Sequence, residues 1–284
     1  MRTPLVRLDD RIWLKLENLQ PIGSFKLRGA ANAVLSSEVP AEGLWTASAG
    51  NMSQGVAWCA RLLGVPCSVI VPEGAAQTKL ERTRALGADV IEVSFDEWWE
   101  VFRTREREGM RGLFVHAFAD PLVIEGNGTI GSEIVEDLPG VDAIVAPFGG
   151  GGLACGIASA VDVPVYAAEV DTGAPLAPSL AAGEPVEVEY RHTFVDGIGG
   201  PVVLPEMFEL AQKLLAGSIV VSVDAAAAGV RTLAERARVV AEGAAGAGLA
   251  AAGQVEGDAV VVVVSGGNID LDVLARILRG EQLQ

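Results

Sequence analysis

Short runs of hydrophobic residues alternate along the chain with longer stretches in which hydrophobic residues recur every three to four positions. The short runs predict β-strands at residues 12–16, 44–48, 67–72, 89–93, 112–117, 142–148, 163–170, 218–223 and 259–265. Stretches with the helical period, such as 51–64 and 78–87, lie between most of them. This alternation predicts an α/β fold of mostly parallel sheets flanked by helices, in which ligands bind where strands end and helices begin.

The strand predicted at 142–148 ends in the most distinctive loop of the sequence. Gly149, Gly150, Gly151 and Gly152 follow it directly and open a helix with Leu153. Glycines let backbone N–H groups approach a ligand closely, and a helix N-terminus favours an anion, so the loop predicts a phosphate site. The chain has neither a GxGxxG pattern in its first strand–helix unit nor a Walker lysine, which disfavours a dinucleotide or a nucleoside triphosphate. The alternative is a tight turn.

Three other loops carry polar groups at strand ends or helix starts. Ser48, Gly50 and Asn51 precede a helical stretch, where successive N–H groups could hold a carboxylate or where Ser48 or Asn51 caps the helix. Ser265 ends the last predicted strand, where its hydroxyl either meets a ring nitrogen or belongs to an ordinary turn. Lys26 opens a helical stretch after Phe25. Lysines are mostly exposed, so the neighbouring loops must decide its role.

Composition narrows the class of protein. The 284 residues are 50% hydrophobic and 20% charged, which is typical of a globular protein. A net charge of −16 argues against nucleic acid and against an anionic membrane as partners. The three cysteines lack metal-binding spacing, no apolar run is long enough to span a membrane, and no signal peptide is evident, so a reduced cytoplasmic protein is expected. Neither histidine lies in a hydrolase or zinc motif.

The loops resemble, in the same order along the chain, the motifs of the fold-type II pyridoxal-phosphate enzymes. SFKLRGA (24–30) is similar to the family's Schiff-base lysine motif and SAGNMSQGVA (48–57) to its substrate-carboxylate loop. GGGGL (149–153) is similar to its phosphate loop and SGGN (265–268) to its pyridine-nitrogen loop. Weaker similarities, as at 64–93 and 126–134, extend the resemblance over nearly the whole chain. KLENLQPIGSFKLRGA with SAGN points to the serine/threonine dehydratase (threonine ammonia-lyase) branch.

The resemblance implies pyridoxal 5'-phosphate as the cofactor and a role for each motif residue. Lys26 would form the Schiff base and move the Cα proton of the substrate, which a lysine can do only while part of its population is neutral. Phe25 would pack against the cofactor, Asn51 would bind the ring hydroxyl and Ser265 the ring nitrogen. The phosphate would be bound by Gly149, Gly150, Gly151, Gly152 and Leu153, and the substrate carboxylate by Ser48, Gly50, Asn51 and Met52.

Three positions bear on the reaction that the resemblance implies. Ser265 does not hold the ring nitrogen protonated as an aspartate would, which favours β-elimination over transamination. Ala49 stands where racemases resembling this family have a second serine, which favours elimination over racemisation. Met52 replaces the usual histidine and predicts a more apolar pocket for a bulkier substrate than serine. The expected reaction converts a β-hydroxy amino acid such as threonine or serine to a 2-oxo acid and ammonia. The alternatives are β-replacement as in cysteine synthases, a threonine-synthase-like reaction, and a degenerate protein that only binds cofactor.

The same resemblance predicts the organisation of the chain. Residues 1–41 and 120–284 would form a large cofactor-binding domain, and residues 42–119 a small domain with the substrate-carboxylate loop. Glu169 resembles one ligand of the family's divalent-cation site, but Pro175 replaces a later carboxylate, so no metal is expected. A homodimer with a small amino-acid substrate is expected. Against the family the chain begins late, without an N-terminal helix, and no regulatory domain is expected after Gln284.

Overall fold

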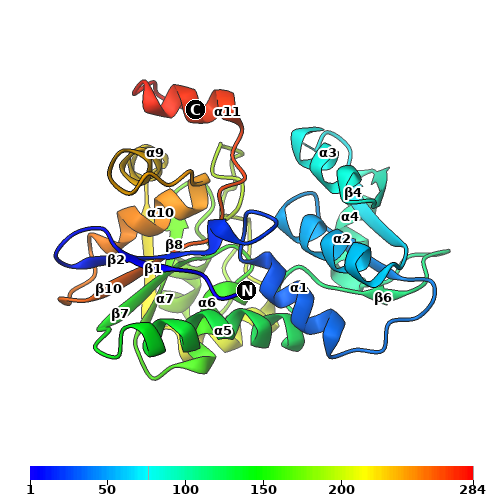
Figure 1. Ribbon diagram of the computed structural model, residues 1–284, viewed down its shortest axis with the longest axis horizontal. Coiled ribbons are helices and arrows are strands. Elements are labelled where there is room, and N and C mark those ends of the chain that lie inside the picture. Colours follow the sequence, from blue (N-terminus) through cyan, green and yellow to red (C-terminus); the bar gives the residue numbers. More distant parts are fainter. Residues whose placement is uncertain (76, 284) are drawn as a thin grey trace. The chain divides into compact units, whose positions relative to one another are not determined.

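The computed structural model describes residues 1–75 and 77–283. Its contacts divide the chain into two compact units, one formed by Met1–Phe25 with Asn127–Gln284 and the other by Lys26–Gly126. Each unit is built on its own sheet, and Figure 1 labels the elements. The predicted α/β class with mostly parallel sheets is therefore confirmed.

The larger unit is built on a six-stranded sheet in the order β1-β2-β10-β7-β8-β9. Its strands are β1 (Leu5–Arg7), β2 (Ile12–Leu16), β7 (Ala143–Pro147), β8 (Val165–Val170), β9 (Gly217–Val221) and β10 (Val260–Val264). Only the β1–β2 pair is antiparallel among these neighbours. Val262 pairs with Leu14 of β2 and with Val145 of β7, and every residue of β10 is fully buried. A continuous apolar strand of this kind requires cover on both faces.

Helices supply that cover. Those of the larger unit are η1 (Glu17–Leu19), most of α5 (Pro121–Asp137), α6 (Gly152–Ala160), α7 (Leu176–Ala182), α8 (Pro205–Leu214), α9 (Val223–Thr232), the π-helix η2 (Leu233–Ala237), α10 (Gly243–Ala252) and α11 (Leu271–Leu278). In Figure 1, α9 and α10 lie over one face of the sheet, while α5 and α6 lie over the other. Alternate residues of β2, β7 and β10 pack with the alanines of α10 in one core.

The smaller unit is built on a four-stranded parallel sheet in the order β5-β4-β3-β6. Its elements are α1 (Lys26–Leu35), β3 (Leu44–Ala47), α2 (Asn51–Leu63), β4 (Cys67–Pro72), α3 (Gln77–Ala85), β5 (Asp89–Val93), α4 (Phe95–Thr104), β6 (Leu113–Phe114) and the start of α5. The strand predicted at 112–117 is thus shorter than expected, because the chain bends at Ala117 and Phe118.

The unit boundaries at residues 25/26 and 126/127 lie outside the predicted small domain of residues 42–119. Helix α1 accounts for much of the difference, because its first turn packs closely against α2. A Cβ atom on Gly55 would lie 3.2 Å from that of Ala30 and 3.4 Å from the carbonyl oxygen of Lys26. The amide of Asn32 also donates to the carbonyl of Leu122 at 2.8 Å, which ties α1 to the start of α5.

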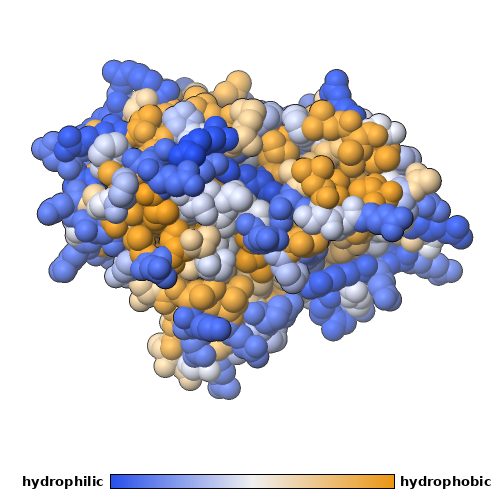
Figure 2. All heavy atoms as spheres, turned by 60° about the horizontal axis from the view of Figure 1, so that its bottom comes forward, coloured by the Kyte–Doolittle hydropathy of each residue, from blue (hydrophilic) through white to orange (hydrophobic). Residues whose placement is uncertain are grey.

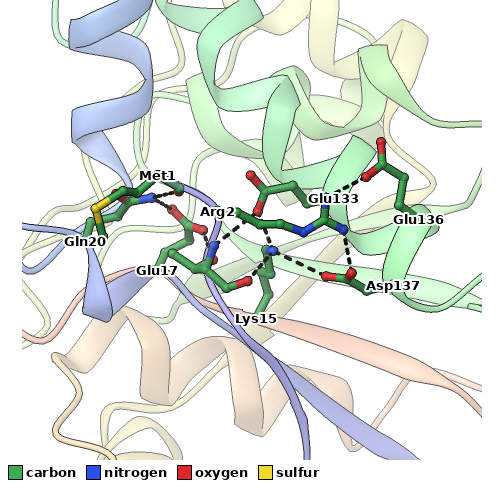
Figure 3. Close-up of polar contacts among 9 residues, drawn as sticks. Met1, Arg2, Lys15, Glu17, Gln20, Glu133, Glu136 and Asp137 are labelled. Atoms are coloured by element: carbon green, nitrogen blue, oxygen red, sulfur yellow. Dashed lines mark hydrogen bonds and ion pairs between the residues drawn. The ribbon is translucent and has the colours of Figure 1, made fainter.

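A polar cluster fastens the N-terminal segment of the larger unit to α5 (Figure 3). Lys15 of β2 is fully buried, and its Nζ donates to the carbonyl of Thr3 at 2.8 Å and to the carboxylate of Glu133 at 2.5 Å. Arg2 pairs with Glu136 and Asp137 at the end of α5. A buried lysine is unfavourable unless its charge is paired. The pairing of Lys15 with Glu133 holds β2 against α5, and the chain continues from β2 to Phe25.

Hydrophobic and hydrophilic residues both lie on the surface of the molecule. Figure 2 shows hydrophobic residues gathered in patches between hydrophilic ones on the face in view. Leu35, Leu62, Phe95 and Leu271 are among the large hydrophobic residues that are more than half exposed. Within the described part of the chain, no helix has the length and apolar character needed to cross a bilayer.

Candidate functional site

The larger unit brings two of the predicted loops to one edge of its sheet. Strands β7 and β10 are parallel neighbours, so their carboxyl ends lie side by side. The glycine loop, which we define as Gly149–Leu153, follows β7, and Ser265 follows β10. Crossover topology therefore places together residues that are more than a hundred positions apart in the sequence.

The glycine loop contains a position, Gly151, whose backbone conformation requires glycine. Gly151 is the N-cap of α6 and has a φ of +91°, in the left-handed region that favours glycine. A Cβ atom there would lie 3.0 Å from the ring of Phe148 and 3.1 Å from the methyl group of Met207. Gly151, Gly152 and Leu153 are buried, while Gly149 and Gly150 are half-buried. The loop presents a helix N-terminus without charged side chains, which suits an anion.

Ser265 and Phe25 are held together by backbone pairing. The N–H of Phe25 donates to the carbonyl of Ser265 at 2.9 Å, and Ser24 forms a bridge with Gly266. Ser265 is 2% exposed, and none of the described residues forms a hydrogen bond with its hydroxyl. A buried hydroxyl without a partner is unfavourable, so this one is suited to meet a ligand atom.

The smaller unit contains Lys26, the first residue of α1. Its side chain is half-buried, and its Nζ donates to the carbonyl of Ala117 at 2.7 Å. Ala117 lies in the turn that follows β6. The amine of the predicted Schiff-base lysine thus donates to a backbone carbonyl of the same unit.

The loop formed by Ser48–Met52 follows β3, which is a parallel neighbour of β6. The N-cap of α2 is Gly50, so neither Ser48 nor Asn51 is the capping residue. Asn51 is half-buried at the first helical position, and Met52 is 1% exposed, so the side chain of Met52 is part of the packed interior. The amide of Gly50 donates to the hydroxyl of Ser48 at 3.3 Å.

Two buried hydroxyl groups support this loop. Ser53 Oγ donates to the carbonyl of Gly50 at 2.6 Å and lies 3.0 Å from Thr83 Oγ1, which bonds the carbonyl of Lys79 at 3.1 Å. Each hydroxyl has one hydrogen, so while Ser53 donates to Gly50 the Thr83 hydroxyl donates either to Lys79 or to Ser53. Both side chains are fully buried. The network fixes the carbonyl of Gly50 and so fixes the direction of the peptide group that follows it.

Two supporting residues were not predicted from the sequence. Asn127 is 1% exposed, and its amide nitrogen donates to the carbonyl of Gly152 at 3.0 Å, which braces the start of α6. His116 is 2% exposed and accepts two backbone hydrogen bonds in the turn next to Lys26. The similarity over residues 126–134 was the available signal for Asn127, whereas His116 was considered only as a hydrolase or metal residue.

Glu169 is engaged by the protein itself. Its carboxylate accepts from the N–H of Leu176 at 2.8 Å, from that of Ala177 at 2.9 Å and from the hydroxyl of Ser218 at 2.6 Å. Burial raises the pKa of this carboxyl group, and the three hydrogen bonds oppose that effect. Glu169 therefore serves to anchor the start of α7 and β9.

Known proteins resemble this chain over most of its length. A family model described as pyridoxal-phosphate dependent enzyme matches residues 1–266. An L-threonine ammonia-lyase of Thermotoga maritima is 42% identical over 280 residues, covering 94% of this chain and 69% of the relative. The solved structure of the processed form of threonine deaminase isoform 2 from Solanum lycopersicum is 30% identical with a TM-score of 0.88, covering 98% of this chain and 88% of that one. The solved structure of maize serine racemase is 28% identical with a TM-score of 0.88, covering 99% of this chain and 92% of that one.

The residues of the larger unit fit the cofactor of that family. The Ser265 hydroxyl offers a buried hydrogen-bonding group without a partner among the described residues, as a ring nitrogen needs. The glycine loop offers a helix start in which side chains are excluded at Gly151. Both features lie at the carboxyl ends of neighbouring strands, where ligands of α/β sheets bind.

Proposed function

Because the chain belongs to the family of pyridoxal-phosphate dependent enzymes, we propose that it converts a β-hydroxy amino acid to a 2-oxo acid and ammonia, by elimination of water followed by hydrolysis. The observation that carries this proposal is the 42% identity with an L-threonine ammonia-lyase over 94% of the chain. Relatives also include a serine racemase structure, which is less similar in sequence at 28% identity. Ala49, whose methyl group cannot transfer a proton, supports elimination over racemisation.

Pyridoxal phosphate, when bound, withdraws electron density from the Cα of an attached amino acid. The chain's residues would then have distinct tasks. Lys26 Nζ would hold the cofactor and afterwards take the Cα proton. In the structure this amine donates to the carbonyl of Ala117. The Ser265 hydroxyl would bond the ring nitrogen, Phe25 would pack against the ring, and Asn51 would bond the ring hydroxyl.

Backbone N–H groups would bind the two anionic ends. Those of the glycine loop would hold the phosphate, and those of Ser48, Gly50, Asn51 and Met52 would hold the substrate carboxylate. Breaking the Cα–H and Cβ–O bonds releases water, and hydrolysis of the resulting enamine then releases ammonia. The departing hydroxyl must be protonated as it leaves. The preference for threonine or a bulkier substrate over serine, which the replacement of histidine by Met52 predicts, stays a prediction, because the Met52 side chain is 1% exposed and lies in the packed interior.

The test is a screen of threonine, serine, 3-hydroxyaspartate and a β-aryl serine, following ammonia and 2-oxo acid. Lys26→Ala is expected to abolish both the Schiff-base absorbance and turnover. Lys26→Arg should fail as well, because arginine stays protonated. A thiol or sulfide is added with O-acetylserine in parallel. Cysteine formation there, with no oxo acid from any hydroxy amino acid, would replace the proposal with β-replacement.

Two broader properties stay predictions. We propose a homodimer and a cytoplasmic location, as the resemblance implies. Light scattering of the purified protein tests the first, and fractionation of cells that express the chain tests the second. A monomer at all concentrations would contradict the dimer.

A further inference from the structure

His116 is a buried histidine in the turn that follows β6. It is 2% exposed and packs among aromatic rings, with centroid distances of 4.6 Å to Phe102, 4.9 Å to Phe118 and 6.2 Å to Phe114. Burial lowers the pKa of the imidazole to about 3, with help from the positive charges of Arg105 and Lys26. A hydrogen bond with the backbone of Phe102 acts in the opposite direction. The imidazole is therefore neutral at neutral pH and retains one acceptor nitrogen.

That acceptor nitrogen holds the turn. His116 Nδ1 accepts from the N–H of Phe118 at 3.2 Å and from the N–H of Ala119 at 2.8 Å. The N–H of Phe118 belongs to the same planar peptide group as the carbonyl of Ala117. Fixing the N–H on one side of this group therefore fixes the direction of the carbonyl on the other.

The carbonyl of Ala117 accepts a hydrogen bond from Lys26 Nζ at 2.7 Å. A lysine side chain has four flexible carbon–carbon bonds, so its amine has no fixed place unless a partner supplies one. All of these residues lie within the smaller unit. The contacts thus form a chain from the imidazole through one peptide group to the amine.

We propose that His116 is a positioning residue, which sets the place of the Lys26 amine through the peptide group of Ala117 and Phe118. The inference rests on the proposed function only in taking Lys26 as the reactive amine. Whenever that amine is not bonded to cofactor, the carbonyl of Ala117 holds it in one place. The imidazole itself touches neither substrate nor cofactor in this role and exchanges no proton.

Two substitutions of His116 distinguish the effect of its Nδ1 acceptor from the effect of its ring in the aromatic packing. His116→Asn keeps an acceptor atom near the position of Nδ1, whereas His116→Phe keeps a ring of similar size among the aromatic neighbours without an acceptor. Phe102→Leu is the matched control, because it disturbs the same aromatic packing and leaves the acceptor in place. Circular dichroism and thermal melting establish that each variant is folded.

The first measurement needs no substrate. Cofactor-free protein is mixed with pyridoxal phosphate, and Schiff-base formation is followed by absorbance and located at Lys26 by borohydride reduction and mass spectrometry. We expect capture to slow by about tenfold in His116→Phe, as for loss of one hydrogen bond. His116→Asn and Phe102→Leu should stay close to the unsubstituted protein. Equal slowing in His116→Phe and Phe102→Leu would reduce His116 to a packing residue and overturn the inference.

The second measurement uses turnover and the unsubstituted protein. For whichever substrate the screen identifies, kcat should fall in His116→Phe with little change in KM, whereas kcat of His116→Asn should stay close to that of the unsubstituted protein.

Hydrogen exchange of the Phe118 and Ala119 amides, measured by NMR, should be slow in the unsubstituted protein. Fast exchange at both amides would overturn the inference even if His116→Phe failed to fold. Failure of the dehydratase proposal would leave the capture and exchange results unaffected, so the two are distinguishable.

Discussion

The glycine loop of the larger unit and the Ser48–Met52 loop of the smaller unit occupy the same kind of position in their sheets but differ in how strictly the fold requires their glycines. Each links the end of a parallel strand to the start of a helix. At Gly151 the backbone has a φ of +91°, and a Cβ would lie 3.0 Å from Phe148. At Gly50 the φ is −123°, and apart from the adjoining residues of the chain no described atom lies within 4 Å of the place for a Cβ. The fold itself requires glycine at Gly151, whereas at Gly50 a methyl group would meet open space.

The largest effect that follows from this comparison is expected for Gly151→Ala. A side chain at that φ is strained by about 1–3 kcal/mol, and the approach to Phe148 and Met207 adds to the strain. The free energy of unfolding should fall by at least this amount in chemical denaturation, and pyridoxal-phosphate binding should weaken. Gly140→Ala is the control, since apart from the adjoining residues of the chain no described atom lies within 4 Å of its Cβ position. Equal stability of the two variants would refute the requirement.

A smaller and more selective effect is expected for Gly50→Ala. The added methyl group meets open space, so the free energy of unfolding and the Schiff-base absorbance should not change. If the N–H groups of the loop receive a substrate carboxylate, the methyl group should obstruct it and raise KM by about tenfold. A KM equal to that of the unsubstituted protein would place the carboxylate elsewhere.

The strands show how much of the fold could be predicted from the sequence. The valine run of β10 was predicted to within one residue at each end, because a continuous apolar strand between turn residues has few other interpretations. The strand predicted at 112–117 is only Leu113–Phe114, because the chain bends at Ala117 and Phe118, where His116 accepts two N–H groups. Strand β1 was not predicted, since three residues after Pro4 are too few to show a period.

Candidate site residues were recognised where their side chains, or the absence of one, form a motif. Gly149–Leu153, Lys26 and Ser265 belong to this class, and their roles stay predictions. Ala117 could not be found in this way, because it acts through its carbonyl, which every residue has. Asn127 and His116 act on backbone groups that are near only in the folded chain. Residues that support a site through the backbone therefore leave little signal in a single sequence.

The smallest effect, and the one with a distinctive sign, is expected for Ser265→Ala. In the cofactor-free protein the substitution removes a buried hydroxyl that lacks a partner among the described residues. The free energy of unfolding should therefore stay the same or rise by up to ~1 kcal/mol, instead of falling as most substitutions make it do. With pyridoxal phosphate present, the same substitution removes the proposed partner of the ring nitrogen, and the affinity for the cofactor should fall by about threefold to tenfold. Denaturation with and without cofactor measures both quantities on one sample. The opposite pattern, a less stable cofactor-free protein with unchanged cofactor affinity, would make Ser265 an ordinary turn residue and leave the glycine loop as the principal cofactor contact of the larger unit.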